Sequence, residues 1–248
     1  MFNTQGSSKA RLALASVALL AGGLASAETV LIDFGNDTSY RGASVPGGVD
    51  SNGNSWNSVW SGAFYTNLLD TNGNATNINF GFSSATGTDY FNGPSGPNED
   101  PSQSVYNAAA LGLLGVDEAV YDYYVTSTFQ IQGLEAGKTY DLSFYGSHAF
   151  SNDPTTRYTA YEDATFSTEI ASADLNIQDV AMPWLHNQDT TALLSGLTAD
   201  ADGIIYIGFY GANGGDGYLN ALQIDVVPAP GAAALLAMGG LAATRRRR

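Results

Sequence analysis

The chain has 248 residues, no cysteine and a formal net charge of −15. The charge is unevenly distributed, because all 24 acidic residues but only three of the nine basic residues lie between positions 28 and 227, which gives this region a formal charge of −21. Such a charge repels nucleic acid and anionic lipid, so we expect no nucleic-acid partner. The absence of cysteine excludes disulfides, thiol catalysis and zinc–thiolate sites.

Residues 1–27 have the organisation of a secretory signal peptide. Lys9 and Arg11 form a basic flank, and an apolar run follows from Leu12 to Leu24. Ala25–Ala27 supplies the small residues that signal peptidase requires. We therefore expect signal peptidase to cut before Glu28 and the rest of the chain to be exported.

Residues 28–227 have the composition and periodicity of a β-protein, being rich in turn-forming and aromatic residues and poor in Lys and Glu. Apolar residues alternate, as in strands with one buried face, in four segments: Val30–Phe34, Phe129–Ile131, Tyr140–Phe144 and Leu222–Val226. The segment Ile204–Tyr210 is apolar on both parities, which predicts a central strand covered on two faces. Only Ser104–Val125 has segments that could form a short helix or two.

Turns separate these strands at Asn52–Gly53, Asn72–Gly73, Glu135–Lys138 and Ala201–Gly203, and Phe91–Gln103 is the clearest loop. The sequence therefore predicts an all-β fold. We expect a single β-sandwich domain over residues 28–227, between an N-terminal signal helix and a short C-terminal apolar helix.

One motif occurs twice, twenty residues apart, as DSNGN in Asp50–Asn54 and DTNGN in Asp70–Asn74. Oxygen atoms at alternate positions suit a hard cation such as calcium, so Asp50, Asn52 and Asn54 are candidate metal ligands. The motif is not an EF-hand, because its glycine is in the fourth position rather than the sixth. Two Asn-Gly turns, each capped by its aspartate, are the alternative.

Sugar-binding sites stack the apolar face of a sugar ring on an aromatic side chain and bind its hydroxyls through polar groups. Trp56 is the preferred platform, because its neighbours are turn residues, and Trp60 and Trp184 are further candidates. The candidate polar residues lie in the connection after Tyr145 and in the GANGGDG loop before the final strand: His148, Asn152, Asp153, Arg157, Asn213 and Asp216. Core packing is the alternative role for each aromatic residue, and a structural ion pair for Arg157.

Residues 228–248 form a distinct tail, PAPGAAALLAMGGLAATRRRR. A helix over Ala232–Ala243 would rise roughly 18 Å, against a hydrocarbon core of roughly 30 Å, so the tail is a transient anchor rather than a permanent span. The terminal arginine cluster resists translocation and stays on the cytoplasmic side. The residues expected to direct sorting are Pro228, Pro230, Gly231, Arg245, Arg246, Arg247 and Arg248.

The order of these features, a proline motif, an apolar stretch and a basic end, resembles the PEP-CTERM sorting domain, which is also catalogued as the ice-binding protein C-terminal domain. Ala229 departs from the usual motif, which has glutamate between the two prolines. The resemblance implies transient anchoring in the inner membrane and cleavage by an exosortase-type transpeptidase. It further implies a final location at the cell surface or in an exopolysaccharide matrix.

The segments LIDFG (Leu31–Gly35), GLEAGKTYDLSFYGS (Gly133–Ser147) and GYLNALQI (Gly217–Ile224) together resemble galactose-binding-like jelly rolls, including carbohydrate-binding modules and malectin-like domains. A fibronectin type III fold is the competing interpretation, because Leu134, Gly137 and Tyr140 also resemble a tyrosine corner. Two hundred residues would require two such domains, and the first half lacks a second corner, so we favour the jelly roll.

These observations predict an exported, surface-sorted, non-catalytic protein that binds polysaccharide or acts in the extracellular matrix. No GxSxG nucleophile elbow is present. A calcium-stabilised structural envelope protein is one alternative, and a glycan hydrolase or lyase is the other. Structural calcium is the one cofactor under consideration, and the expected partners are signal peptidase, the exosortase-type enzyme, polysaccharide and the inner membrane.

Overall fold

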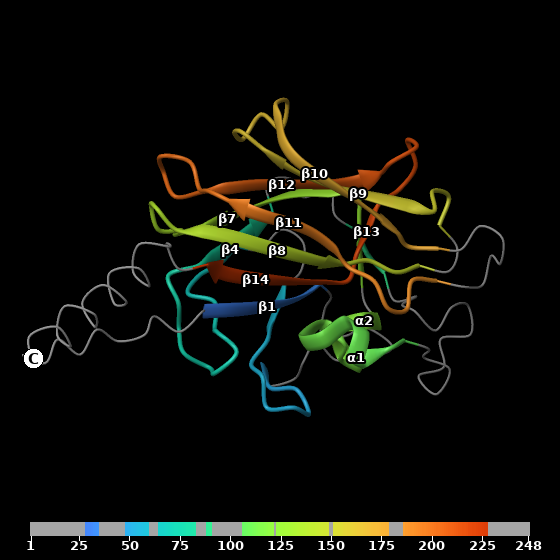
Figure 1. Cartoon of the computed structure of the whole chain (residues 1–248), viewed down its shortest axis with the longest axis horizontal. Helices are drawn as coiled ribbons and strands as arrows, with labels where there is room; N and C mark the ends of the chain where they lie inside the picture. The colour runs from blue at the N-terminus through green and yellow to red at the C-terminus, as the bar shows by residue number, and fades with distance from the viewer. Residues whose placement is uncertain are drawn as a thin grey trace, which may run out of the picture.

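The computed structural model describes residues 28–34, 48–59, 64–82, 88–90, 106–121, 123–148, 151–178 and 186–227 (Figure 1). The expected signal peptide and sorting tail lie outside the described residues, as do Trp60 and Trp184. Within the described part the protein is an all-β structure with three sheets and two short α-helices, so the predicted all-β class is confirmed.

The five-stranded sheet has the order β11-β8-β14-β1-β2. Its strands are β11 (Ala192–Leu197), β8 (Thr139–Tyr145), β14 (Ala221–Val227), β1 (Glu28–Phe34) and β2 (Asn57–Val59). Neighbouring strands are antiparallel except for β1 and β2, which are parallel. The first and last described strands of the chain are therefore neighbours at the centre of one sheet.

The six-stranded sheet has the order β10-β9-β12-β7-β4-β3, and all of its strand pairs are antiparallel. Its strands are β10 (Glu169–Asn176), β9 (Thr155–Tyr161), β12 (Ile205–Gly211), β7 (Ser127–Gln132), β4 (Asn79–Phe82) and β3 (Phe64–Tyr65). A smaller sheet joins β13 (Tyr218–Leu219), β6 (Tyr123–Val125) and β5 (Thr88–Tyr90).

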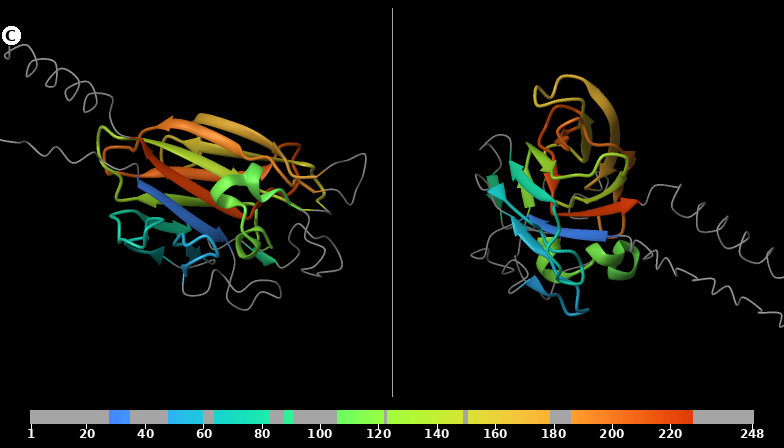
Figure 2. Two further views of the ribbon diagram at one scale, coloured as in Figure 1. Left: turned by 60° about the horizontal axis from the view of Figure 1, so that its bottom comes forward. Right: turned by 90° about the vertical axis from the view of Figure 1, so that its left-hand side faces the viewer.

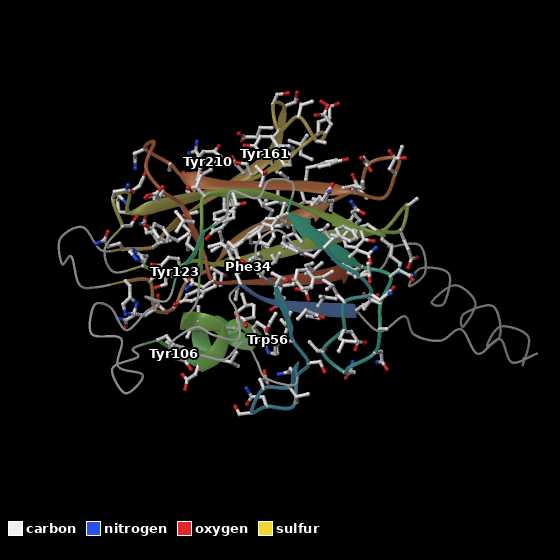
Figure 3. All side chains as sticks on the ribbon, turned by 180° about the vertical axis from the view of Figure 1, so that it is seen from behind. Phe34, Trp56, Tyr106, Tyr123, Tyr161 and Tyr210 are labelled. Carbon is white, nitrogen blue, oxygen red and sulfur yellow. The ribbon has the colours of Figure 1, made fainter. Side chains whose placement is uncertain are left out.

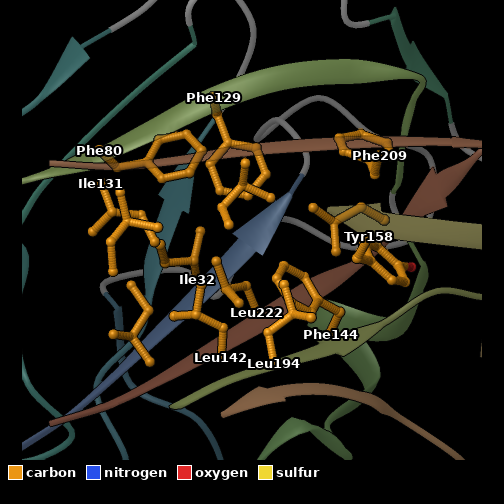
Figure 4. Close-up of a cluster of buried hydrophobic side chains, with 14 of the residues drawn as sticks. Ile32, Phe80, Phe129, Ile131, Leu142, Phe144, Tyr158, Leu194, Phe209 and Leu222 are labelled. Atoms are coloured by element: carbon orange, nitrogen blue, oxygen red, sulfur yellow. The ribbon is translucent and has the colours of Figure 1, made fainter. Parts of the chain in front are cut away.

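Both large sheets contribute side chains to one hydrophobic core (Figure 4). Ile32, Leu142 and Leu222 from the five-stranded sheet and Phe80 and Phe129 from the six-stranded sheet are each fully buried. The four segments with alternating apolar residues all form strands whose apolar side chains enter this core, as predicted. The segment that is apolar at both odd and even positions forms β12, which pairs with β9 on one side and β7 on the other.

Two short helices cover the other face of the five-stranded sheet (Figure 2). Within the expected helical segment, α1 (Ala108–Leu111), a 3₁₀ turn (Gly112–Leu114) and α2 (Asp117–Tyr121) form, and its last residues belong instead to β6. Their apolar side chains pack on Leu31, Tyr145 and Ala221 in a second buried cluster. No helix within the described ranges is long and apolar enough to cross a bilayer.

The strand registers place the two ends of the described chain side by side. Glu28 of β1 lies opposite Val226 of β14, and Val227 lies opposite Thr139 at the start of β8. The turn between β7 and β8 also lies at this end, where the Tyr140 hydroxyl accepts a hydrogen bond from the Glu135 N–H at 2.7 Å. This bond corresponds to the tyrosine corner that the sequence suggested, here in a turn that connects the two large sheets.

Candidate functional site

Two loops meet at the opposite end of the sheets from the chain ends. One is the connection from β8 to β9, and the other is the connection from β12 to β13. The strand registers bring the two loops together. Tyr145, where the first loop begins, pairs with Ala221, two residues after the end of β13. Gly211, where the second loop begins, pairs with Thr156, the second residue of β9. Four of the seven predicted ligand-binding residues lie where these loops touch: Asn152, Asp153, Asn213 and Asp216.

Asp153 is the centre of this loop cluster and is 1% exposed. Its carboxylate accepts hydrogen bonds from the backbone N–H of Asn213 at 2.6 Å, from the Asn213 side-chain amide at 2.9 Å and from the N–H of Thr155 at 3.1 Å. Burial opposes ionisation, but these donors prevail and hold the pKa of Asp153 below its usual value. The carboxylate therefore fastens the β12–β13 loop to the start of β9.

Asn152 and Asp216 form a reciprocal pair on the exposed side of the same cluster. The Asn152 amide nitrogen donates to Asp216 Oδ2 at 3.1 Å, and the Asp216 backbone N–H donates to Asn152 Oδ1 at 2.9 Å. These bonds hold both side chains in fixed orientations at the loop tips. The arrangement supplies amide and carboxylate groups at a preorganised polar surface, and each group keeps further capacity to donate or accept hydrogen bonds.

Two glycines make the close contact between the loops possible. A Cβ atom on Gly215 would lie 2.7 Å from Asn152 Oδ1 and 2.8 Å from the Asp153 Cβ atom. A Cβ atom on Gly211 would lie 2.4 Å from the carbonyl oxygen of Gly215. The glycines of the GANGGDG loop therefore set the distance at which its polar residues approach β9.

Arg157 lies next to the loop cluster but is paired elsewhere. Its guanidinium makes two bonds to the Asp174 carboxylate, from Nε at 2.6 Å and from the second terminal nitrogen at 2.7 Å. This cross-strand pair between β9 and β10 raises the pKa of Arg157, first through the hydrogen bonds and then through the charge of Asp174. The structural ion pair, which the sequence left open as its alternative role, is present.

His148 lies inside the protein rather than at the loop tips. It is 7% exposed and stacks on Tyr218, with ring centroids 4.3 Å apart and an interplanar angle of 9°. Tyr123 meets it edge-on at 4.8 Å. Burial, with a contribution from His186, lowers the pKa of His148 to about 4. His148 is therefore a neutral core residue beneath the site.

Trp56 also lies inside the protein, so the prediction that it forms a sugar-binding platform is wrong. It is 2% exposed and belongs to the buried cluster under the helices (Figure 3). Its indole Nε1–H donates to Asp50 Oδ2 at 3.0 Å. Sequence neighbours of turn type suggested exposure, but packing against Leu31 and the helical segment removes the ring from solvent.

The candidate metal ligands form a capped turn. Asp50 Oδ1 accepts hydrogen bonds from the backbone N–H groups of Asn52 at 2.8 Å and Asn54 at 2.9 Å. Burial opposes ionisation of Asp50, yet the bonds from Trp56 and Asn54 hold its pKa below the usual value. The carboxylate oxygens thus face N–H donors, which is the capped-turn alternative.

The same turn recurs twice. Asp70 Oδ1 accepts from Asn72 and Asn74, and Asp200 Oδ1 accepts from Asp202 at 3.0 Å and Ile204 at 2.8 Å. In the described part of the chain, no group of three or more His, Asp or Glu side chains is placed to hold a metal ion.

No family model, curated protein or solved structure matches this chain.

Two threonines that sequence reasoning did not select complete the loop cluster. Thr126 Oγ1 accepts from the Gly217 N–H, and Thr156 Oγ1 accepts from the Tyr218 N–H, each at 2.9 Å. These bonds fix the point at which the β12–β13 loop enters β13. A threonine within or beside a strand is too common to signal such a role, which depends on which strands are neighbours.

Proposed function

We propose that this protein is exported, sorted to the cell surface and binds polysaccharide there without catalysing a reaction. We further propose that its two large sheets form a single jelly-roll sandwich of the galactose-binding-like type. The observation that carries the binding proposal is the loop cluster, in which Asn152, Asp153, Asn213 and Asp216 converge from loops about sixty residues apart in the sequence. Bonds within and between the loops hold these residues before any ligand arrives.

The position of the loop cluster supports presentation to the outside. Glu28 and Val227 lie at one end of the five-stranded sheet, and the loop cluster lies beyond the other end. Only Pro228–Gly231 separates β14 from the apolar tail, and four extended residues span at most roughly 14 Å. While the tail is anchored, the chain ends therefore face the membrane and the loop cluster points away from it.

The charge of the domain restricts the class of glycan. Residues 28–227 have a formal charge of −21, and one of these carboxylates, that of Asp216, lies at the loop cluster itself. An anionic polysaccharide would be repelled, particularly at low ionic strength, where the Debye length is long. We therefore propose an uncharged glycan as the ligand.

A glycan array tests this proposal with the exported protein and two variants. In the first variant, Asn152→Ala and Asp216→Ala remove the reciprocal pair, while Asp153 and the buried bonds remain. The control is Asn72→Ala, an exposed residue in a turn that bonds to Thr29 of β1, at the end of the sheet away from the loop cluster. We expect binding to uncharged glycans by the wild type and the control, and a loss of about tenfold in affinity for the double variant. Binding by all three proteins alike would disprove the assignment of the site.

A further inference from the structure

A row of outward-facing side chains crosses the six-stranded sheet. On β4, Gly81 lies opposite Phe64 of β3 and Gln130 of β7. Gln130 lies opposite Tyr206 of β12, which in turn lies opposite Tyr161 of β9. Residues adjacent to them on each strand enter the core, so this aromatic row lies on the face of the sheet turned away from it, although Tyr206 itself is only 7% exposed. The row consists of Phe64, Gly81, Gln130, Tyr206 and Tyr161. Five strands at ~4.8 Å spacing give the row a length of roughly 19 Å.

At one end of the aromatic row, Phe64 lies across a glycine. A Cβ atom on Gly81 would lie 2.3 Å from the Phe64 ring, so only glycine allows the ring to settle against the β4 backbone. Even so, Phe64 is 52% exposed. Exposure of a large apolar ring to water on an edge strand is unfavourable in free energy. A ligand that covered the ring would remove this unfavourable exposure.

At the other end, three aromatic rings form a cluster. Phe166, in the turn between β9 and β10, meets Tyr161 at a centroid distance of 5.6 Å and Tyr206 at 6.0 Å, both edge to face. Phe166 has a φ of +52°, a backbone conformation that favours glycine. Tyr161 in turn lies over Gly208, where a Cβ atom would be 3.0 Å from its ring. The turn therefore holds the Phe166 ring over this end of the aromatic row, although position 166 has a backbone conformation that phenylalanine rarely adopts.

Acidic side chains border this aromatic cluster. Burial raises the pKa of Tyr206, and the charge of Asp200 and its hydrogen bond with the Tyr206 hydroxyl raise it further, with smaller contributions from Asp202 and Asp163. These carboxylates would repel an anionic ligand. Gln130, between the two aromatic ends, offers a neutral amide donor and acceptor to the same surface.

We propose that the aromatic row binds one linear chain of an uncharged polysaccharide across the strands of the sheet. Sugar rings would stack on Phe64 at one end and on Phe166 and Tyr161 at the other, and the Gln130 amide would bind a hydroxyl between them. This proposal rests on the proposed function and names a second binding surface for it. The surface is separate from the loop cluster, so the two can be tested independently.

Electrophoresis of the exported protein through native gels that contain one soluble polysaccharide provides the test. The probes are galactomannan, xyloglucan and hydroxyethyl cellulose, with alginate as an anionic probe. The variant is Phe64→Ala with Phe166→Gly, since glycine relieves the positive φ at position 166. Leu193→Ala is the matched control, because Leu193 is 54% exposed on β11 of the other sheet. Melting temperatures establish whether each variant is folded. If the double variant is not folded, the single variant Phe64→Ala takes its place.

We expect an uncharged probe to retard the wild type and the control, and the variant to lose about tenfold in affinity, as when an aromatic anchor is removed. Equal retardation of variant and wild type overturns the assignment of the aromatic row as a binding surface but leaves the proposed function standing. If alginate alone retards the wild type, the proposal that the ligand is uncharged is overturned. If no probe and no arrayed glycan binds the wild type, both proposals fail. A wild-type dimer that Phe64→Ala dissociates in sedimentation would assign the surface to a second copy and overturn the proposal.

Discussion

Asp153 receives both the backbone N–H and the side-chain amide of Asn213, at 2.6 and 2.9 Å, across sixty residues of sequence. Because Asp153 is 1% exposed and accepts several part-buried hydrogen bonds, its removal would leave these donors without their acceptor. We expect Asp153→Ala to lower the free energy of unfolding by about 3 kcal/mol in chemical denaturation.

Asp163→Ala is the control for Asp153, since Asp163 caps an exposed turn through Thr165. It should cost less than about 1 kcal/mol, in the range of an exposed cap. Similar losses for the two variants would show that the loop cluster contributes no more to stability than an ordinary turn. Glycan binding by Asp153→Ala should also fall, because the β12–β13 loop would no longer be fastened to β9.

The repeated turn offers a comparison within one chain. Asp50 and Asp70 cap turns of the same geometry, but only Asp50 also binds the indole of a buried tryptophan, Trp56. We expect Asp50→Ala to cost about 1–3 kcal/mol more than Asp70→Ala, because the buried Nε1–H would lose its acceptor. Denaturant titrations of both variants measure this difference. An equal loss would mean that the indole bond contributes nothing.

Calcium can be tested on the same turns. The Asp50 and Asp70 carboxylates already accept N–H donors from their own turns, so we expect the melting temperature to be the same in calcium and in a chelator. Scanning calorimetry of the protein measures this. A clear rise with calcium that Asp50→Ala abolishes would restore the sequence interpretation of Asp50, Asn52 and Asn54 as metal ligands.

Acid should destabilise the protein through His148. Its pKa in the folded state, about 4, lies below the value of 6.5 expected for the unfolded chain, so folding favours the neutral ring. The resulting stability is complete above pH 6.5 and is lost as the pH falls toward 4. The loss amounts to about 2 kcal/mol by pH 5. Unfolding measured between pH 7.5 and 5 should show this slope, and His148→Gln should flatten it. A slope unchanged in His148→Gln would assign the effect to other groups, His186 first.

Local patterns predicted the strands well, because alternation is a property of a single segment. Val30–Phe34 and Leu222–Val226 each bury the predicted face, although nothing in either segment shows that the two strands pair. The prediction for Trp56 is wrong because its burial depends on residues outside its own segment. Its turn-type neighbours were visible in the sequence, but the helical segment that covers it begins about fifty residues later.

The loop cluster and the aromatic row differ in how much sequence signal they carry. A glycine-rich loop with Asn213 and Asp216 is visible as a segment, so its residues could be selected before their partners were known. The aromatic row has no such signal, because Phe64, Gln130 and Tyr206 lie on strands far apart in the chain. Only the strand order and registers place them side by side on one face.

The sorting role proposed for the tail gives the last prediction. A cluster of arginines resists translocation, so if the tail acts as proposed we expect replacement of Arg245–Arg248 by neutral residues to release or mislocalise the protein. Fractionation into inner membrane, surface and medium, followed by immunoblotting, measures the outcome. The double variant Asn152→Ala with Asp216→Ala is the control and should sort as the wild type does, because the loop cluster lies at the other end of the domain from Val227. An unchanged distribution of the arginine variant would show that the tail is not a sorting signal.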